Sequence, residues 1–105
     1  AQIEQVLINL LRNAINAVAG RGDKSIGIEV IQSAGSCTIS VTDNGRGIPQ
    51  EQLDKIFIPF YTTRKDGSGI GLTLSKQIMH RHGGHIEVNS VQGNGATFRL
   101  VFPAA

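Results

Sequence analysis

The sequence contains no tryptophan, one tyrosine, one cysteine and no long apolar run, and each shortage excludes a class of protein. The single Cys37 excludes an internal disulfide and a four-cysteine zinc site, and it favours a reducing, cytoplasmic setting. No stretch of about 18 apolar residues is present, so no segment is expected to span a membrane. The first residues also lack the pattern of a signal peptide, and no direct membrane contact is expected.

The charge distribution argues against a nucleic-acid partner. The net charge is only +2, from ten basic and eight acidic residues scattered along the chain. A nucleic-acid interface normally needs a basic face in which aromatic residues are interleaved. The charges here are scattered, and aromatic residues make up just 5% of the sequence. With 40% hydrophobic residues in 105, the composition is typical of one globular domain. Because the pattern begins directly in a helix, we expect a piece of a longer protein.

Hydrophobic periodicity predicts the order helix, hairpin, loop, helix, hairpin. Apolar residues at three- and four-residue spacing indicate helices, and strict alternation indicates strands. The predicted helices span residues 2–18, 50–56 and 69–82, the predicted strands span 25–31, 37–43, 85–91 and 96–102, and residues 57–69 are expected to be irregular. This order indicates an α/β (α+β) two-layer sandwich, in which helices cover one face of a mixed sheet.

The first predicted helix carries a stripe of amides. Gln5, Asn9, Asn13 and Asn16 recur at spacings that place them on one side of the helix. Asparagine is a poor helix former, and a merely solvated stripe would favour long charged residues instead. Short amide oxygens on a rigid helix suit a hard cation such as Mg²⁺. The alternative is that these amides only form hydrogen bonds with neighbouring backbone.

Asp43 is the sharpest single indication of a site. It continues the alternation of Ile39 and Val41, so its carboxylate is expected to point toward the apolar side of the strand. A buried carboxylate needs a donor, and the exocyclic amine of adenine would serve because an ionised carboxylate only accepts. Gly45 and Gly47 would let the backbone approach a planar base closely. The alternative interpretation is an ordinary Asp-Asn-Gly turn.

A glycine-rich segment, residues 67–72, leads into the second long predicted helix. The free N–H groups at a helix N-terminus form an anion site. The spacing G-x-G-x-G matches neither the dinucleotide pattern nor the Walker pattern, so a flexible loop is the alternative. Residues 62–65, directly before it, offer hydroxyls and positive charge to a phosphate, or form a solvated surface run.

The three histidines do not indicate a metal site. His80 and His82 are two residues apart on a predicted helix and point about 200° apart around it. They and His85 are expected at the surface or at a helix end. No Ser/His/Asp or Cys/His arrangement is indicated either.

Five segments together resemble the sequence boxes of one family, the catalytic and ATP-binding domain of bacterial two-component sensor histidine kinases. Their order and spacing agree over nearly the whole chain. Residues 5–14 resemble the N box, 43–48 the G1 box, 56–64 the F box, 67–72 the G2 box and 93–98 the last glycine box. The short lid between Phe60 and Gly69 is most similar to that of nitrogen- and oxygen-sensing kinases.

This resemblance implies the Bergerat (GHKL) ATP-binding fold, shared with gyrase, mismatch-repair ATPases and a heat-shock chaperone, and it implies ATP and Mg²⁺ as cofactors. Asn13 would ligate Mg²⁺, Asn9 would support the phosphates, and Asp43 would accept the adenine amine. The implied nucleotide-binding residues are Asn9, Asn13, Asp43, Gly45, Gly47, Ile48, Phe57, Phe60, Arg64, Gly69, Gly71, Leu72 and Thr97, of which Asn9 and Arg64 are catalytic and Asn13 is the metal ligand.

The chain departs from the family pattern at three places. The ATPase relatives carry a glutamate as general base where this chain has Asn9, and its absence favours transfer to an incoming histidine over attack by water. Many histidine kinases have a Lys-Tyr pair where this chain has Asn16 and Ala17. Ala96 stands where a threonine often follows the final glycine, which leaves the role of Thr97 open.

The resemblance also implies what lies outside the sequence. None of the histidines has the His-Glu context of a phosphoacceptor, so residues 1–105 are expected to be the catalytic domain of a longer kinase. Its partners would be the phosphoacceptor-histidine dimerisation domain of that kinase and the receiver domain of a response regulator. The piece is expected to be a monomer and the whole kinase a homodimer. A GHKL-type ATPase and a non-catalytic nucleotide-sensing module are the alternative functions.

Overall fold

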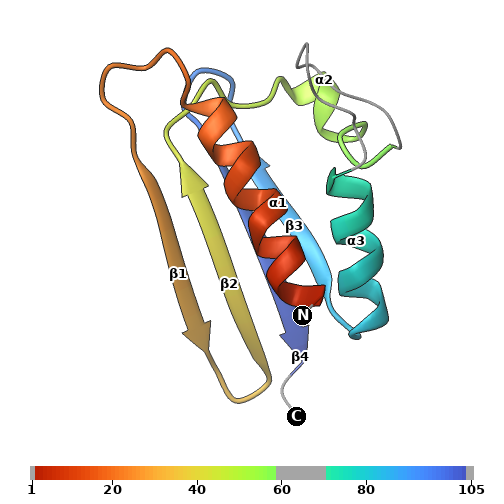
Figure 1. The fold of residues 1–105 in the computed structure, drawn as a ribbon. Helices are drawn as coiled ribbons and strands as arrows, with labels where there is room; N and C mark the ends of the chain where they lie inside the picture. Colours follow the sequence, from red (N-terminus) through yellow and green to blue (C-terminus); the bar gives the residue numbers. More distant parts are fainter. Residues whose placement is uncertain (1, 59–70, 104–105) are drawn as a thin grey trace.

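In the part of the chain that the structure describes, three helices and four strands follow one another in the order that the sequence predicts (Figure 1). The computed structural model describes residues 2–58 and 71–103. The elements are α1 (Gln2–Ala17), β1 (Ile26–Gln32), β2 (Ser36–Asp43), α2 (Gln50–Leu53), α3 (Gly71–Arg81), β3 (His85–Ser90) and β4 (Ala96–Pro103). The predicted boundaries are confirmed to within two residues, except that the short helix α2 ends three residues early. Most of the segment predicted to be irregular lies outside the described residues.

The strands form one sheet in the order β1-β2-β4-β3. The predicted two-layer sandwich is confirmed, but the predicted mixed sheet is wrong for the described strands, because all three of their pairings are antiparallel. β2 and β3 run in the same direction and are joined through α3, as parallel neighbours would be. However, β4 lies between them and pairs antiparallel with both, so these two strands never become neighbours.

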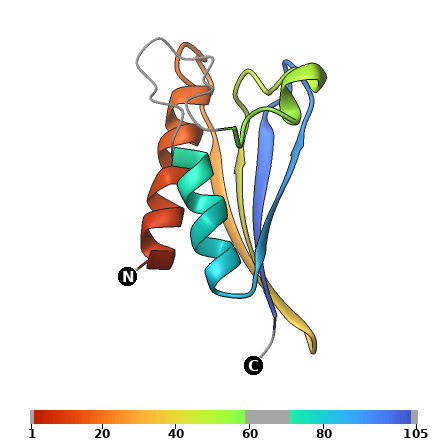
Figure 2. The same cartoon turned by 90° about the vertical axis from the view of Figure 1, so that its right-hand side faces the viewer.

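Helices α1 and α3 lie side by side on one face of the sheet (Figure 2). α1 buries Val6, Leu10 and Ala14 against it, while Leu100 in β4 has no exposed surface. Removing a leucine side chain from water stabilises a fold by roughly 1.5–3 kcal/mol, so this apolar stripe fixes how α1 lies on the sheet. The rest of the buried core consists of Val41 in β2, Ile56 after α2, Ile78 and Met79 in α3, and Ala96 and Phe98 in β4. The amide stripe of α1 therefore lies beside the apolar stripe.

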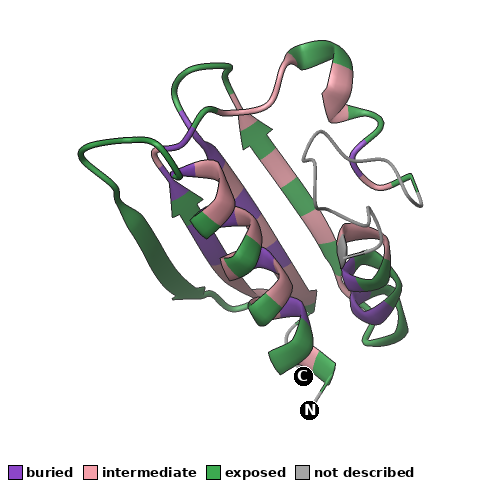
Figure 3. Ribbon diagram, turned by 45° about the horizontal axis from the view of Figure 1, so that its top comes forward, coloured by how far each residue is buried: buried purple, intermediate pink, exposed green. Residues whose placement is uncertain are grey.

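The edge strand β1 contributes little to this core. All seven of its residues are exposed, as the green strand in Figure 3 shows. Ile26 and Ile28 pair with Asp43 and Val41, which places them on the face that the helices cover elsewhere. No helix among the described residues is long and apolar enough to cross a membrane. The well-packed part of the molecule is thus formed by α1, α3, β2, β3 and β4.

Candidate functional site

The buried carboxylate of Asp43 is the centre of the candidate site. Asp43 is the last residue of β2 and is 6% exposed, so the prediction that it points inward is confirmed. Its Oδ1 accepts a hydrogen bond from the N–H of Gly45 at 2.8 Å. Burial raises the pKa of Asp43 above its ordinary value, while the N–H groups of Gly45 and Ala96 and the charge of Arg46 oppose this rise. An ionised carboxylate has room for about four hydrogen bonds, so capacity remains for a further donor.

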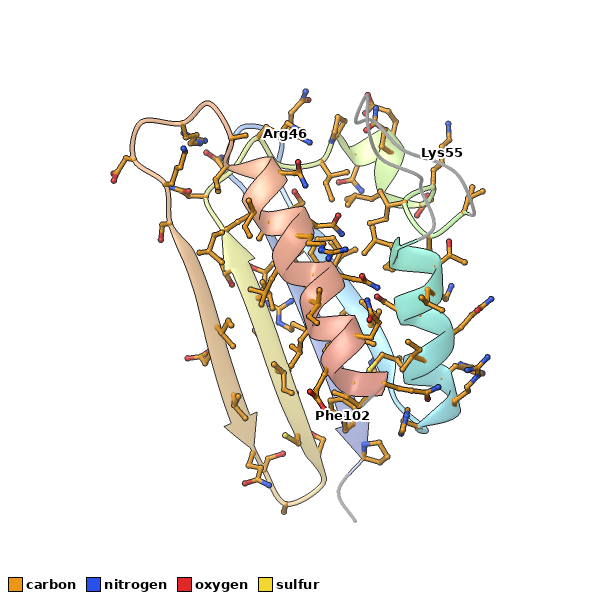
Figure 4. The ribbon with its side chains drawn as sticks, in the orientation of Figure 1. Arg46, Lys55 and Phe102 are labelled. Carbon is orange, nitrogen blue, oxygen red and sulfur yellow. The ribbon has the colours of Figure 1, made fainter. Side chains whose placement is uncertain are left out.

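Residues 43–48, which start at Asp43 and continue into the loop after β2, are called the G1 loop below. On one side it lies against the C-terminal end of α1, where Figure 4 labels Arg46. The N–H of Arg46 donates to the carbonyl of Ala17 at 3.1 Å, and its Nη1 donates to the carbonyl of Asn16 at 3.0 Å. A Cβ on Gly45 would overlap the carbonyl oxygen of Ala17. Glycine is therefore required here by the contact between two backbones.

On its other side the G1 loop lies against the turn between β3 and β4, residues 91–95. The N–H of Gly93 donates to the carbonyl of Arg46 at 2.7 Å, and the N–H of Ile48 donates to Ser90 Oγ at 2.8 Å. Gly47 has a φ of 72°, and a Cβ there would overlap the carbonyl oxygen of Val91. The loop carrying Asp43 is thus held from both sides. Sequence reasoning missed Ser90, for which the only signal is its place just before a glycine-rich turn.

The amide stripe of α1 divides into three different roles. Asn9 Nδ2 donates to the hydroxyl of Ser75, a fully buried residue of α3, at 3.2 Å. Gln5 Nε2 donates to Asn9 Oδ1, also at 3.2 Å. Asn16 Nδ2 donates to the carbonyl of Arg12 at 2.9 Å, so for this residue the backbone interpretation is correct.

Asn13 differs from its neighbours in the stripe. It is half-buried and lies one turn after Asn9 and one turn before the contact of Ala17 with the G1 loop. Among the residues that the structure describes, no hydrogen bond uses its side-chain amide. A half-buried amide oxygen that has no hydrogen bond to the described residues fits the preference of Mg²⁺ for oxygen ligands that leave several waters in place.

Apart from Thr97, the remaining predicted residues either lie in the described part of the chain or fall outside it. Phe57, Ile48 and Leu72 are partly buried against the core. The carbonyl of Phe57 accepts a hydrogen bond from Thr73 Oγ1 at 2.8 Å, and Lys76 Nζ lies 5.4 Å from the centre of its ring, so α3 holds this residue from two sides. Gly71 is the first residue of α3. Phe60, Arg64 and Gly69 lie outside the described residues.

The predicted residue Thr97 lies on the sheet face opposite to that of Asp43. Its Oγ1 lies 3.1 Å from Thr42 Oγ1, and both hydroxyls project from the sheet face opposite the helices. Its neighbours Ala96 and Phe98 are buried on the helix side. Alternation along β4 gives the position beside Asp43 to Ala96, and contact of Thr97 with the nucleotide stays a prediction. The alternation of Phe98 and Leu100 already contained this signal.

Together these features define a class of protein. It is an α/β sandwich domain in which one end of the sheet carries a buried carboxylate between glycine loops, and the adjoining helix presents amide oxygens. Such an arrangement suits a ligand with an amine-bearing planar base and a cation-bound anionic group.

Comparison with known proteins identifies the family. Residues 1–105 match the family described as "Histidine kinase-, DNA gyrase B-, and HSP90-like ATPase", and the chain belongs to it. The sensor histidine kinase ZraS of Escherichia coli K12 is 44% identical over 102 residues, which are 97% of this chain and 22% of that protein. The kinase AtoS of the same organism is 46% identical over 102 residues, covering 96% of this chain and 16% of that protein. The chain is thus a histidine kinase-type domain that spans about a fifth of such relatives.

Solved structures agree with this assignment. The catalytic domain of histidine kinase ThkA has a TM-score of 0.84 and 37% sequence identity, over 97% of this chain and 67% of that one. The mycobacterial sensor histidine kinase MprB has a TM-score of 0.85 and 28% identity, over 97% of this chain and 70% of that one. The predicted resemblance to sensor histidine kinases and the predicted two-layer α/β sandwich are both confirmed, whereas the predicted short lid lies outside the described residues.

Proposed function

We propose that this chain binds Mg-ATP and supplies its γ-phosphate to a histidine on a separate dimerisation domain in two-component signalling. The observation that carries the proposal is Asp43, a buried carboxylate with spare acceptor capacity at the end of a strand. Membership of the histidine kinase-type family supports the same function. Because the chain covers 22% of ZraS, the phosphorylated histidine and the partners of the whole protein belong to this proposal.

Asp43 selects the base in this proposal. An ionised carboxylate accepts the exocyclic amine of adenine, whereas guanine presents a carbonyl at the equivalent position and would set two acceptors against each other. The N–H of Gly45 donates to Oδ1 and so directs the carboxylate. Gly45, Gly47 and Ile48 would border the base, because they form the loop that follows Asp43.

The amides of α1 and the start of α3 handle the phosphates. Asn13 would hold Mg²⁺ through its side-chain oxygen, and the ion, when bound, offsets the negative charge of the phosphates. Asn9 is oriented by Gln5 and Ser75, which fixes the direction of its amide. α3 begins at Gly71, the last glycine of the glycine-rich segment, and the N–H groups of its first turn are proposed to contact the phosphates. Arg64 and Gly69 are proposed to contact the phosphates, and Phe60 is proposed to anchor the lid. All three lie outside the described residues.

The phosphoryl acceptor is a histidine rather than water. Asn9 cannot remove a proton, so water is not activated at this position. In the transfer, the bond between the γ-phosphorus and the bridging oxygen breaks, a bond to an imidazole nitrogen forms, and ADP leaves. The dimerisation domain of the same kinase would present that histidine, and the receiver domain of a response regulator would take the phosphoryl group next.

The test is a comparison of ATP and GTP binding by this chain in the presence of Mg²⁺. A charge-assisted hydrogen bond is worth roughly 1.5–3 kcal/mol, so GTP should bind at least about tenfold more weakly than ATP. Equal affinities would rule out the proposed role of Asp43.

With labelled Mg-ATP, phosphate should appear on an added phosphoacceptor domain and not on this chain alone. Phosphate on the chain itself would contradict the proposed division of labour.

A further inference from the structure

An arginine outside the family boxes bridges the two loops beside Asp43. Arg21 follows the end of α1, and its Nη2 donates to the carbonyl of Gly45 at 3.2 Å and to the carbonyl of Gly93 at 2.8 Å. Gly45 belongs to the G1 loop and Gly93 to the turn between β3 and β4. A guanidinium carries several N–H donors in a fixed plane, so one side chain can hold two carbonyls, whereas an ammonium acts as a point charge.

Ser90 joins the same two segments at a second point. Its hydroxyl accepts the hydrogen bond from the N–H of Ile48 at 2.8 Å and donates to the carbonyl of Gly95 at 2.8 Å. The other hydrogen bond between the segments, from Gly93 to Arg46, joins backbone to backbone. Arg21 and Ser90 are thus the side chains through which substitution can loosen this contact without altering the glycines.

Gly45 connects this bridge to the carboxylate. Its carbonyl accepts from Arg21, and its N–H donates to Asp43 Oδ1 at 2.8 Å. A change in the position of Gly45 therefore changes the direction of the carboxylate. On the far side of the bridge, the turn leads directly into Ala96, whose N–H also donates to Asp43.

We infer that Arg21 is a positioning residue for recognition of the nucleotide base, and that Ser90 shares this role. Arg21 and Ser90 clamp the G1 loop to the turn between β3 and β4, and so aim the Asp43 carboxylate. The inference rests on the proposed function, because it assigns the clamp to the same site. It concerns the base and not the phosphates, since both side chains act on the loops around Asp43.

The test uses Arg21→Ala, Arg21→Lys and Ser90→Ala, with Arg12→Ala as the matched control from the exposed face of α1. ATP and GTP affinities are measured for each, together with the urea midpoint of unfolding. Arg21→Ala should weaken ATP binding about tenfold and reduce the preference for ATP over GTP, because both hydrogen bonds of the Arg21 bridge are lost and the Asp43 carboxylate is no longer held in its direction toward the base. The ATP affinity of Arg21→Lys should fall between those of the wild type and Arg21→Ala. Ser90→Ala should resemble Arg21→Ala in both affinity and preference, and Arg12→Ala should match the wild type.

Two results would overturn the inference. One is an Arg21→Ala variant that binds ATP like the wild type. The other is a proportional loss of ATP and GTP binding that accompanies a lowered unfolding midpoint, which is what a purely structural role predicts. If Arg21→Ala fails to fold, the ATP-to-GTP ratio of Ser90→Ala and Arg21→Lys decides the question in the same way. Absence of ATP binding by the wild-type chain would instead refute the proposed function, and this inference with it.

Discussion

Two glycines of one turn provide a matched test of the contact beside Asp43. Gly93 and Gly95 have nearly the same positive φ, 88° and 89°. A Cβ on Gly93 would meet nothing within 4 Å, whereas a Cβ on Gly95 would overlap the carbonyl oxygen of Asp43. Alanine therefore introduces the same backbone strain at both positions but a clash at only one.

The expected magnitudes follow from these two terms. An L-residue in the left-handed region costs roughly 1–2 kcal/mol, so Gly93→Ala should lower the free energy of unfolding by about that amount. Overlap with a well-packed neighbour costs a further 1–3 kcal/mol or so, which gives roughly 2–5 kcal/mol for Gly95→Ala. Because the clash is with the backbone of Asp43, Gly95→Ala should also weaken ATP binding by at least about tenfold, and Gly93→Ala should leave it unchanged.

The assay is urea unfolding followed by far-ultraviolet circular dichroism, since the chain has no tryptophan to report by fluorescence. Each variant that remains folded is then titrated with a non-hydrolysable ATP analogue and Mg²⁺. Equal losses of stability in the two variants would refute the reasoning, as would an unchanged ATP affinity in Gly95→Ala.

Three further predictions concern single side chains. Burial raises the pKa of Asp43 above its ordinary value of 3.8, so ATP affinity should fall as the pH drops through a midpoint above that value. Calorimetric titrations of the wild type and Asp43→Asn at several pH values test this. Over the same range the contribution of Asp43 to the stability of the empty chain should rise as the pH falls, because the folded state binds the proton more tightly. Asn13→Ala should remove the dependence of ATP affinity on Mg²⁺, whereas Asn16→Ala should leave it intact because the Asn16 amide donates to the carbonyl of Arg12. For each variant, the ratio of the ATP affinity in Mg²⁺ to that in a chelator measures this dependence. Thr97→Val should bind ATP like the wild type, and a clear loss would show that the sheet face opposite the helices contributes to the site.

Much of the fold was predictable because its signals are local. The spacing of Val6, Leu10 and Ala14 predicts both α1 and the face that it buries. The alternation of Ile39 and Val41 predicts β2 and the inward direction of Asp43. The antiparallel pairing was not predictable in this way, since it depends on β4 entering the sheet between two strands that precede it in the sequence.

The candidate site was predictable where a residue type is unusual for its position, as with Asp43 at a buried strand end. It was not predictable where ordinary residues act through contacts between distant segments. Ser75 resembles any helical serine until α1 places Asn9 against its hydroxyl. Arg21 resembles any surface arginine until two loops far apart in the sequence present their carbonyls to it.

The most direct test of the central claim is a calorimetric titration of this chain with Mg²⁺ and a non-hydrolysable ATP analogue. Asp43→Ala and Asp23→Ala are measured alongside, because Asp23 is an exposed aspartate that serves as the control. We expect binding in the micromolar-to-millimolar range, retained by Asp23→Ala and abolished by Asp43→Ala. No binding by the unmodified chain, or equal binding by all three, would contradict the account of Asp43 as the residue that holds the adenine base.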